Sequence, residues 1–167
     1  SFWVHMPLGV GKMLTNPSYV WQYMTSAEQH LAERSDYWPR GRMLGGSSSV
    51  NGMVFVRGEP RRYDGWRDQG NPGWGWSDML PFFRKLENRI APEGSVRSPL
   101  RASGGPITCT DTTQRDVVSA AWIEACQQWG IPYNPDYNAE SAEGVSYMQF
   151  SIRDGKRCSA AVGYLAP

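Results

Sequence analysis

Two adjacent glycines followed by three serines constrain this chain more than any other feature of its sequence. The stretch reads "LGGSSSVNG" and contains Gly45, Gly46, Ser47 and Ser48. Glycine permits positive φ angles and removes the Cβ atom that would block a close ligand. Serine is a residue type that commonly caps the N-terminus of a helix. The stretch therefore predicts a tight turn that leads into a helix and lies close to a ligand.

The residues after the serines predict what this ligand is. Val50, Met53 and Val54 have the spacing of one helix face. The N-terminus of a helix has unpartnered N–H groups and a positive dipole end, so it binds phosphate groups. Asn51 follows Ser47 by one helical turn, and its amide can both donate and accept hydrogen bonds. These features predict a diphosphate with a heterocycle or ribitol beside it. An ordinary loop-to-helix junction explains the same letters.

Composition excludes several other classes of function. The formal net charge of the 167 residues is +1, which gives no electrostatic basis for binding nucleic acid. No apolar run approaches the ~20 residues that span a bilayer. The three cysteines form no C-x-x-C pair and the chain has two histidines, so no metal site is predicted. Reduced thiols favour a cytoplasmic location. The first and last residues resemble the interior of a chain, so we expect an internal segment of a longer protein.

The remaining patterns predict a mixture of helices and strands in an α+β (mixed) fold, without a complete βαβ unit. Residues 2–38 are expected to be irregular. Expected helices are Tyr63–Arg67, one capped by Ser77 with an apolar stripe and Pro81 in its first turn, one within 113–130, and Ala160–Leu165 capped by Ser159. Expected strands are Pro106–Thr110 and 145–152, a turn is expected at Asp154-Gly155, and residues 89–105 are expected to form a surface loop. In the helix within 113–130 the apolar residues Val118, Ala121, Trp122, Ala125 and Trp129 are expected to fall on one face.

The glycine–serine stretch resembles the first signature of the glucose–methanol–choline (GMC) family of flavin oxidoreductases. The matching positions are Gly41, Arg42, Met43, Leu44, Gly45, Gly46, Ser47, Ser48, Ser49, Val50, Asn51, Phe55, Gly58 and Asp64. The resemblance continues through "YDGWRDQGNPGWGWSDMLPFFRKLE" and "GKRCSAAVGYL". Within the family the chain is most similar to the bacterial choline dehydrogenase and alcohol dehydrogenase branch.

The resemblance implies part of an FAD-binding domain, followed by the start of a mixed-sheet substrate domain. Residues 1–88 would cover the flavin, and residues 89–167 would begin the substrate domain and return to the flavin-binding domain. The family's G-x-G-x-x-G fingerprint and its catalytic histidine match nothing here, so the βαβ dinucleotide unit is expected to lie outside these residues. Of the two histidines, His5 and His30, we expect one to be packed and the other exposed.

The implied activity is oxidation of a primary alcohol, choline-like or aliphatic, with hydride transfer to FAD. No residue of this chain is predicted to be catalytic. The implied cofactor-binding residues are Leu44, Gly45, Gly46, Ser47, Ser48, Asn51, Gly52, Met53 and Val54. The residues leave the electron acceptor, the particular alcohol and the oligomeric state open. A phosphate- or nucleotide-binding module and a structural fragment without activity remain the alternatives.

Overall fold

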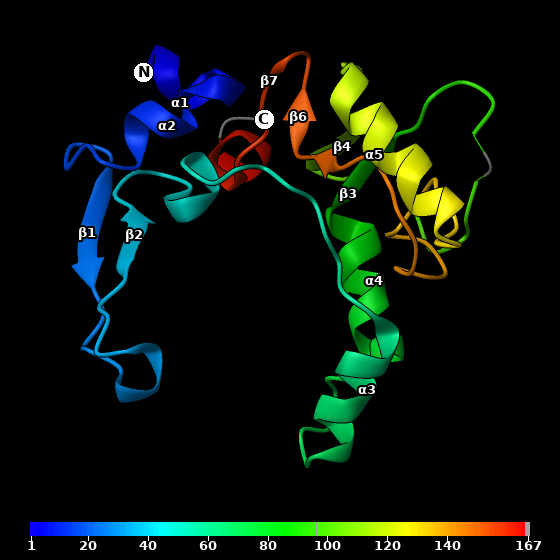
Figure 1. Ribbon diagram of the computed structural model, residues 1–167, viewed down its shortest axis with the longest axis horizontal. Helices are drawn as coiled ribbons and strands as arrows, with labels where there is room; N and C mark the ends of the chain where they lie inside the picture. The colour runs from blue at the N-terminus through cyan, green and yellow to red at the C-terminus, as the bar shows by residue number, and fades with distance from the viewer. Residues whose placement is uncertain (96, 166–167) are drawn as a thin grey trace. The chain divides into compact units, whose positions relative to one another are not determined.

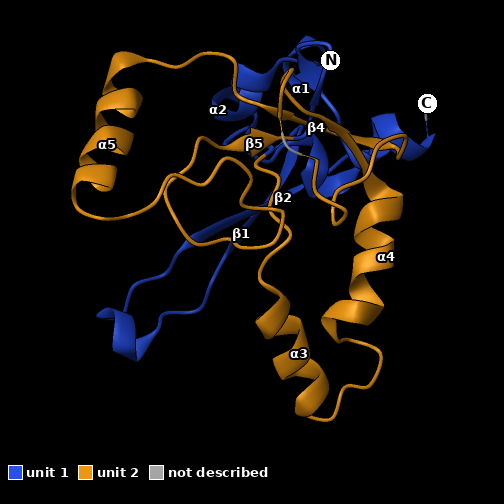
Figure 2. Ribbon diagram, turned by 90° about the vertical axis from the view of Figure 1, so that its right-hand side faces the viewer, with its two compact units in different colours: residues 1–53, 151–167 blue, residues 54–150 orange. Residues whose placement is uncertain are grey.

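The computed structural model describes residues 1–95 and 97–165 and has a mixed α/β architecture (Figure 1). The predicted mixture of helices and strands is therefore confirmed. Contacts between residues divide the chain into two compact units, Ser1–Met53 with Ser151–Pro167, and Val54–Phe150 (Figure 2). The predicted division at residue 88, between a part that covers the flavin and a part that begins the substrate domain, stays a prediction. No helix in the described ranges is long and apolar enough to cross a lipid bilayer.

The first unit is built around an antiparallel hairpin. Strand β1 (Val20–Met24) pairs with β2 (Tyr37–Gly41), with Val20 opposite Gly41 and Met24 opposite Tyr37. The unit also contains α1 (Phe2–His5), η1 (Pro7–Gly9), α2 (Val10–Met13), η2 (Gln29–Leu31), η3 (Gly46–Ser49), β6 (Ile152–Arg153), β7 (Lys156–Arg157) and η4 (Ala161–Leu165). Its buried core consists of Met13, Val20 and Val50.

The expectation of irregular structure over residues 2–38 is wrong at this hairpin. In β1 only Val20 is buried, and the four residues after it are exposed. A strand with one buried face alternates apolar and polar residues, whereas β1 carries aromatic side chains without that alternation. The sequence therefore lacks the pattern by which a strand is recognised.

The second unit contains a three-stranded sheet in the order β3-β4-β5. Strand β3 (Glu87–Ile90) is parallel to β4 (Ile107–Asp111), which is antiparallel to β5 (Gln149–Phe150). The helices of the unit are α3 (Pro60–Asp68), α4 (Trp76–Leu86) and α5 (Val117–Gln128). Tyr63 of α3 makes ring contacts with Trp76 and Phe83 of α4, which hold these two helices together.

The helices predicted at Tyr63–Arg67, after Ser77 and within 113–130 are confirmed in position and corrected in detail. Helix α4 is capped by Gly75 rather than Ser77, because the Asp78 carboxylate accepts a hydrogen bond from the Gly75 N–H at 3.1 Å. Pro81 lies inside α4, beyond its first turn. Helix α5 ends at Gln128, and Gly130, the last residue of the predicted range 113–130, follows the C-cap Trp129 with a φ of 92°.

The apolar face predicted for α5 is exposed in the described part of the chain. Trp122 and Trp129 are 69% and 87% exposed, and Ile123, on another face, is the buried residue of the helix. Helical periodicity shows which residues share a face. It does not show whether other described residues pack against that face.

Four further expectations are resolved by the structure. Residues 89–105 are not all surface loop, because Arg89 belongs to β3 and Arg101 is buried. The expected strand over 145–152 is shorter and consists of β5 followed by the start of β6. The turn at Asp154-Gly155 is confirmed, with φ angles of 51° and 71° between β6 and β7. His5 and His30 are both exposed, so the expectation that one is packed is wrong.

Candidate functional site

The glycine–serine stretch forms a tight turn, as predicted, but no α-helix follows it. Gly45 and Gly46 have φ angles of 85° and 53°. Gly46 is also the first residue of η3, a 3-10 segment of 4 residues that ends at Ser49. The backbone N–H of Met53 then donates to the side-chain oxygen of Asn51 at 3.0 Å, and Met53 itself has a φ of 62°. This local side-chain bond competes with helix formation, so the predicted helix through Val50, Met53 and Val54 is wrong.

The serines stabilise the turn rather than cap a helix. Ser47 Oγ accepts a hydrogen bond from the Gly41 N–H at 3.1 Å. Ser48 Oγ donates to the Gly45 carbonyl at 2.6 Å and accepts from the Ala160 N–H at 2.9 Å. Their predicted roles as N-caps are therefore wrong, because the hydroxyl groups join the turn to the end of β2 and to the segment before η4.

Several predicted site residues in the turn are exposed. Leu44 is 75% exposed, and Ser47, Asn51 and Gly52 are exposed as well. The backbone N–H groups of Leu44, Gly45, Ser47 and Gly52 donate no hydrogen bond to any described residue. A turn with positive φ angles can present such groups to an anion without a helix dipole. The turn therefore offers a ligand peptide donors.

The other predicted residues have different surroundings. Met53 is 5% exposed, so its side chain packs inside the protein. Val54 is 45% exposed and belongs to the second unit, where it forms a bridge with Phe150. Ser48 is half-buried through the bonds described above.

The glycines of the stretch have two distinct roles. A Cβ atom on Gly41 would lie 2.2 Å from the carbonyl oxygen of Gly46, and one on Gly45 would lie 2.5 Å from Ser49 Oγ. These two glycines are required for close packing of the turn. A Cβ atom on Gly46 or Gly52 would meet nothing within 4 Å. These two therefore leave open space beside the unpartnered N–H groups.

Arg157 is a functional residue candidate that the sequence did not reveal. Its side chain is 2% exposed, and Nη1 donates to the Ser48 carbonyl at 3.2 Å and to the Asn51 carbonyl at 2.7 Å. Nη1 also donates to Asn51 Oδ1 at 2.8 Å, and Nε donates to the Val4 carbonyl at 3.0 Å. Burial lowers the pKa of the guanidinium. Arg157 lies in the "GKRCSA" segment, which resembles the GMC family, but that resemblance assigned no role to the arginine.

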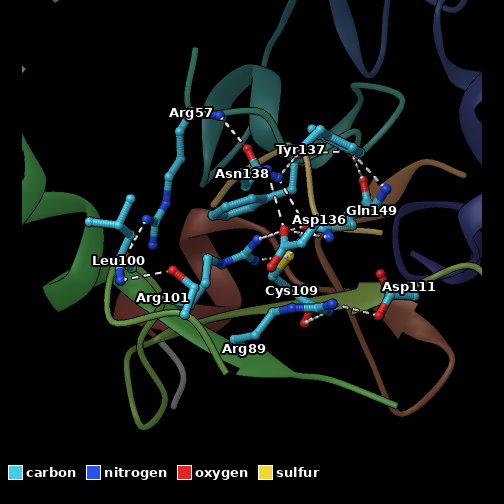
Figure 3. Close-up of polar contacts among 12 residues, drawn as sticks. Arg57, Arg89, Leu100, Arg101, Cys109, Asp111, Asp136, Tyr137, Asn138 and Gln149 are labelled. Carbon is cyan, nitrogen blue, oxygen red and sulfur yellow. Dashed lines mark hydrogen bonds and ion pairs between the residues drawn. The ribbon is translucent and has the colours of Figure 1, made fainter. Parts of the chain in front are cut away.

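A second polar site, in the other unit, is a buried cluster of charges that Figure 3 shows. Glu87 is fully buried and accepts from Arg57 at 2.5 Å and from Arg101 at 2.6 Å. Arg101 also pairs with Asp136 and donates to Gln149 at 3.1 Å. Two arginines and two carboxylates thus balance in charge while they connect β3, β5 and the loops between them.

The pKa values in this cluster follow from burial and pairing. Burial lowers the pKa of Arg57 against the attraction of Glu87. Burial acts in the same direction on Arg101, but hydrogen bonds and charge from Glu87 outweigh it and raise that pKa. Burial also raises the pKa of the Cys109 thiol to about 11, so the thiol stays protonated at neutral pH. A thiol in that state is a poor nucleophile, and the cluster is structural.

Neither metal chemistry nor the surface hollows give a stronger candidate. The described residues contain no group of three or more His, Cys, Asp or Glu side chains that could hold a metal ion. A hollow of about 590 Å³ lies beside Leu80, Arg84 and Ala102, and another of about 410 Å³ lies beside Tyr23 and Trp38. Both are open, and no predicted cofactor-binding residue lines either of them. The turn remains the best candidate because it combines exposed donors with open space.

Comparison with known proteins gives a consistent result. Residues 16–167 match the model of the GMC oxidoreductase family. The chain is 40% identical over 167 residues to human mitochondrial choline dehydrogenase, covering 100% of this chain and 27% of that protein. It is 37% identical over 164 residues to an oxygen-dependent choline dehydrogenase of Brucella anthropi, covering 98% and 29%. It is 35% identical over 162 residues to an alcohol dehydrogenase [acceptor] of Pseudomonas putida, covering 97% and 29%.

Solved structures show the same likeness. The chain superimposes on pyridoxine 4-oxidase from Mesorbium loti with a TM-score of 0.86 and 30% identity, covering 98% of this chain and 31% of that one. It superimposes on an FAD-dependent oxidoreductase from Chaetomium thermophilum with a TM-score of 0.83 and 26% identity, covering 98% and 29%. The chain thus spans less than a third of the length of these relatives.

Proposed function

Because the chain belongs to the GMC oxidoreductase family, we propose that it binds FAD through residues 44–54 as part of an enzyme that oxidises a primary alcohol. The family resemblance of the glycine–serine stretch is confirmed by the match over residues 16–167. The activity is that of a whole protein, and the relatives are more than three times as long as this chain.

The observation that carries the proposal is the set of unpartnered N–H groups beside open space at the turn. Leu44, Gly45 and Ser47 present these donors, and Gly46 and Gly52 lack the Cβ atoms that would fill the space. FAD has diphosphate oxygens and a ring edge with carbonyl oxygens, which are acceptors for such donors. The residues therefore fit FAD through the left-handed turn, rather than through the helix end that the sequence suggested.

In the proposed mechanism this chain binds and orients the cofactor. FAD supplies the acceptor for the hydride that leaves the alcohol carbon. The backbone donors of the turn would fix the position of FAD. Leu44, exposed beside them, would exclude water from the bound group. We assign no proton acceptor within this chain, because His5 and His30 are exposed and lie outside the turn.

The finer assignments follow from the same proposal. The names of the human and Pseudomonas putida relatives support a choline-like or aliphatic alcohol as the substrate. Residues 1–88 would cover the flavin, residues 89–167 would begin the substrate domain, and the βαβ unit would come from other residues. We also propose a cytoplasmic location. The name of the Brucella anthropi relative specifies oxygen and that of the Pseudomonas putida relative an unspecified acceptor, and we propose no electron acceptor for this chain.

A bulky residue at position 52 tests the site directly. In a full-length protein that contains this chain, Gly52→Leu is expected to weaken FAD binding at least about tenfold, which is ~1.4 kcal/mol. The chain has room for this side chain, since a Cβ atom there meets nothing within 4 Å and the φ angle is not positive. The side chain would instead occupy the space proposed for FAD. Flavin absorbance of the purified protein and titration of the apoprotein with FAD give the affinity.

Gly11→Leu is the matched control, because Gly11 has equally open surroundings but lies in α2. It is expected to leave FAD binding unchanged. Equal FAD affinity in the Gly52→Leu variant and the unaltered protein would contradict the assignment. A colourless unaltered protein that binds a nucleotide other than FAD would favour a phosphate-binding module. A protein that binds neither would favour a structural fragment.

A further inference from the structure

We infer that Arg157 is a positioning residue that orients the Asn51 amide, so that Asn51 donates a hydrogen bond to FAD and does not accept one. The inference rests on the FAD site proposed above and adds the direction of one contact. It also assigns a role to a buried arginine that the binding turn itself does not explain.

The direction follows from the partners of the Asn51 side chain. Its Oδ1 accepts from the Met53 N–H at 3.0 Å and from Arg157 Nη1 at 2.8 Å. A backbone N–H and a guanidinium can only donate, so the amide oxygen must lie on their side. The NH₂ group then points away from both, and Asn51 is exposed. The side chain therefore offers a ligand its two N–H bonds.

Arg157 holds this orientation because its own position is fixed. Its Nε is anchored on the Val4 carbonyl at 3.0 Å, and its Nη1 contacts the Ser48 and Asn51 carbonyls. Within the described residues all these acceptors are neutral oxygens, and Arg157 forms no ion pair with a carboxylate. A buried cation without a carboxylate partner is costly. Its contacts therefore indicate that the guanidinium serves the geometry of the Ser48–Asn51 backbone and the Asn51 amide.

FAD has acceptors that match an N–H donor at this place. The isoalloxazine ring has carbonyl oxygens and unprotonated nitrogens, and the diphosphate has anionic oxygens. Both lone pairs of Asn51 Oδ1 are already used by Met53 and Arg157. If instead Asn51 accepted a hydrogen bond from FAD, at least one of these intramolecular bonds would be lost for the one that is gained.

Asn51→Asp separates the two directions. An aspartate keeps the oxygen that Met53 and Arg157 contact, but it has no N–H to donate. In a full-length protein that contains this chain, the melting temperature of the Asn51→Asp apoprotein is expected to be unchanged or higher, since the carboxylate faces a guanidinium. Its affinity for FAD is expected to fall at least about tenfold, as in Asn51→Ala. FAD affinity of Asn51→Asp within about threefold of the unaltered protein would overturn the donor assignment.

A double-mutant cycle tests whether Arg157 acts through Asn51. FAD titrations of Asn51→Ala, Arg157→Met and the double variant are compared with the unaltered apoprotein. The FAD affinity of the double variant is expected to lie within about threefold of that of the single variant with the lower affinity. An effect equal to the product of the two single effects would overturn the positioning role. If Arg157→Met does not fold, Arg157→Lys replaces it, and retention of full FAD affinity in that variant would equally overturn the role. Failure of the unaltered protein to bind FAD would refute the proposed function itself, whereas the outcomes above overturn only this inference.

Discussion

Replacement of Glu87 by alanine is expected to destabilise the second unit by about 3–5 kcal/mol, the cost of removing one partner from a buried ion pair. Glu87 is fully buried and pairs with Arg57 and Arg101 at once. It also accepts the Ala102 N–H at 3.0 Å, so the change leaves a backbone donor without its acceptor. Neither guanidinium can reach water without opening the unit, because their side chains are 1% and 5% exposed.

Thermal and urea unfolding of a full-length protein that contains the chain would measure this loss, with hydrogen exchange to locate it in residues 54–150. Glu87→Gln keeps the volume and one acceptor oxygen but removes the charge, so an intermediate loss is expected. Asp68→Ala is the matched control, since it removes a carboxylate from an exposed pair with Arg67 at 2.9 Å. Exposed pairs contribute little. If Glu87→Ala unfolds like Asp68→Ala, the cluster does not stabilise the unit.

The turn was predictable from its sequence because its glycines act locally. Gly45 and Gly46 have the positive φ angles that their residue type favours, and Gly130 ends α5 for the same reason. The Asp154-Gly155 turn is another such case. At each of these positions the chemistry of one or two residues determines the backbone, and no distant contact competes with it.

The absence of the helix expected after the serines was not predictable, because distant residues compete with it in addition to the local bond between Met53 and Asn51. Arg157, 106 positions from Asn51 in the sequence, contacts its amide and carbonyl oxygens. The backbone N–H of Ala160 likewise donates a hydrogen bond to the Ser48 hydroxyl. A serine in a position typical of a helix cap can equally form a hydrogen bond with a distant segment, and the sequence alone does not distinguish the two.

The charged cluster was missed for a related reason. Glu87, Arg101 and Asp136 are far apart in the sequence, and each alone resembles a solvated surface residue. Their burial depends on the pairing of β3 with β4 and on the loops that follow these strands. Only the assembled unit shows that the charges neutralise one another.

Gly41→Ala is expected to weaken FAD binding by about 100-fold, because overpacking of ~3 kcal/mol would distort the binding turn. The added Cβ atom would lie 2.2 Å from the Gly46 carbonyl oxygen and 2.7 Å from the Ser47 nitrogen. Both are backbone atoms, so no side-chain rotation relieves the clash and the turn must move away from β2. That movement would stretch the bond from the Gly41 N–H to Ser47 Oγ, now 3.1 Å, and displace the donors proposed for FAD.

Gly11→Ala is the control for this substitution, since it also adds one methyl group to a glycine of the first unit. Its Cβ atom meets nothing within 4 Å, and alanine is the better helix former within α2. Titration of each apoprotein with FAD gives the affinity, and thermal unfolding reports whether the fold persists. We expect Gly11→Ala to bind FAD normally, while Gly41→Ala remains folded and loses FAD. If Gly41→Ala binds FAD with unaltered affinity, the geometry of the turn does not control the cofactor, and the site must be sought elsewhere in the protein.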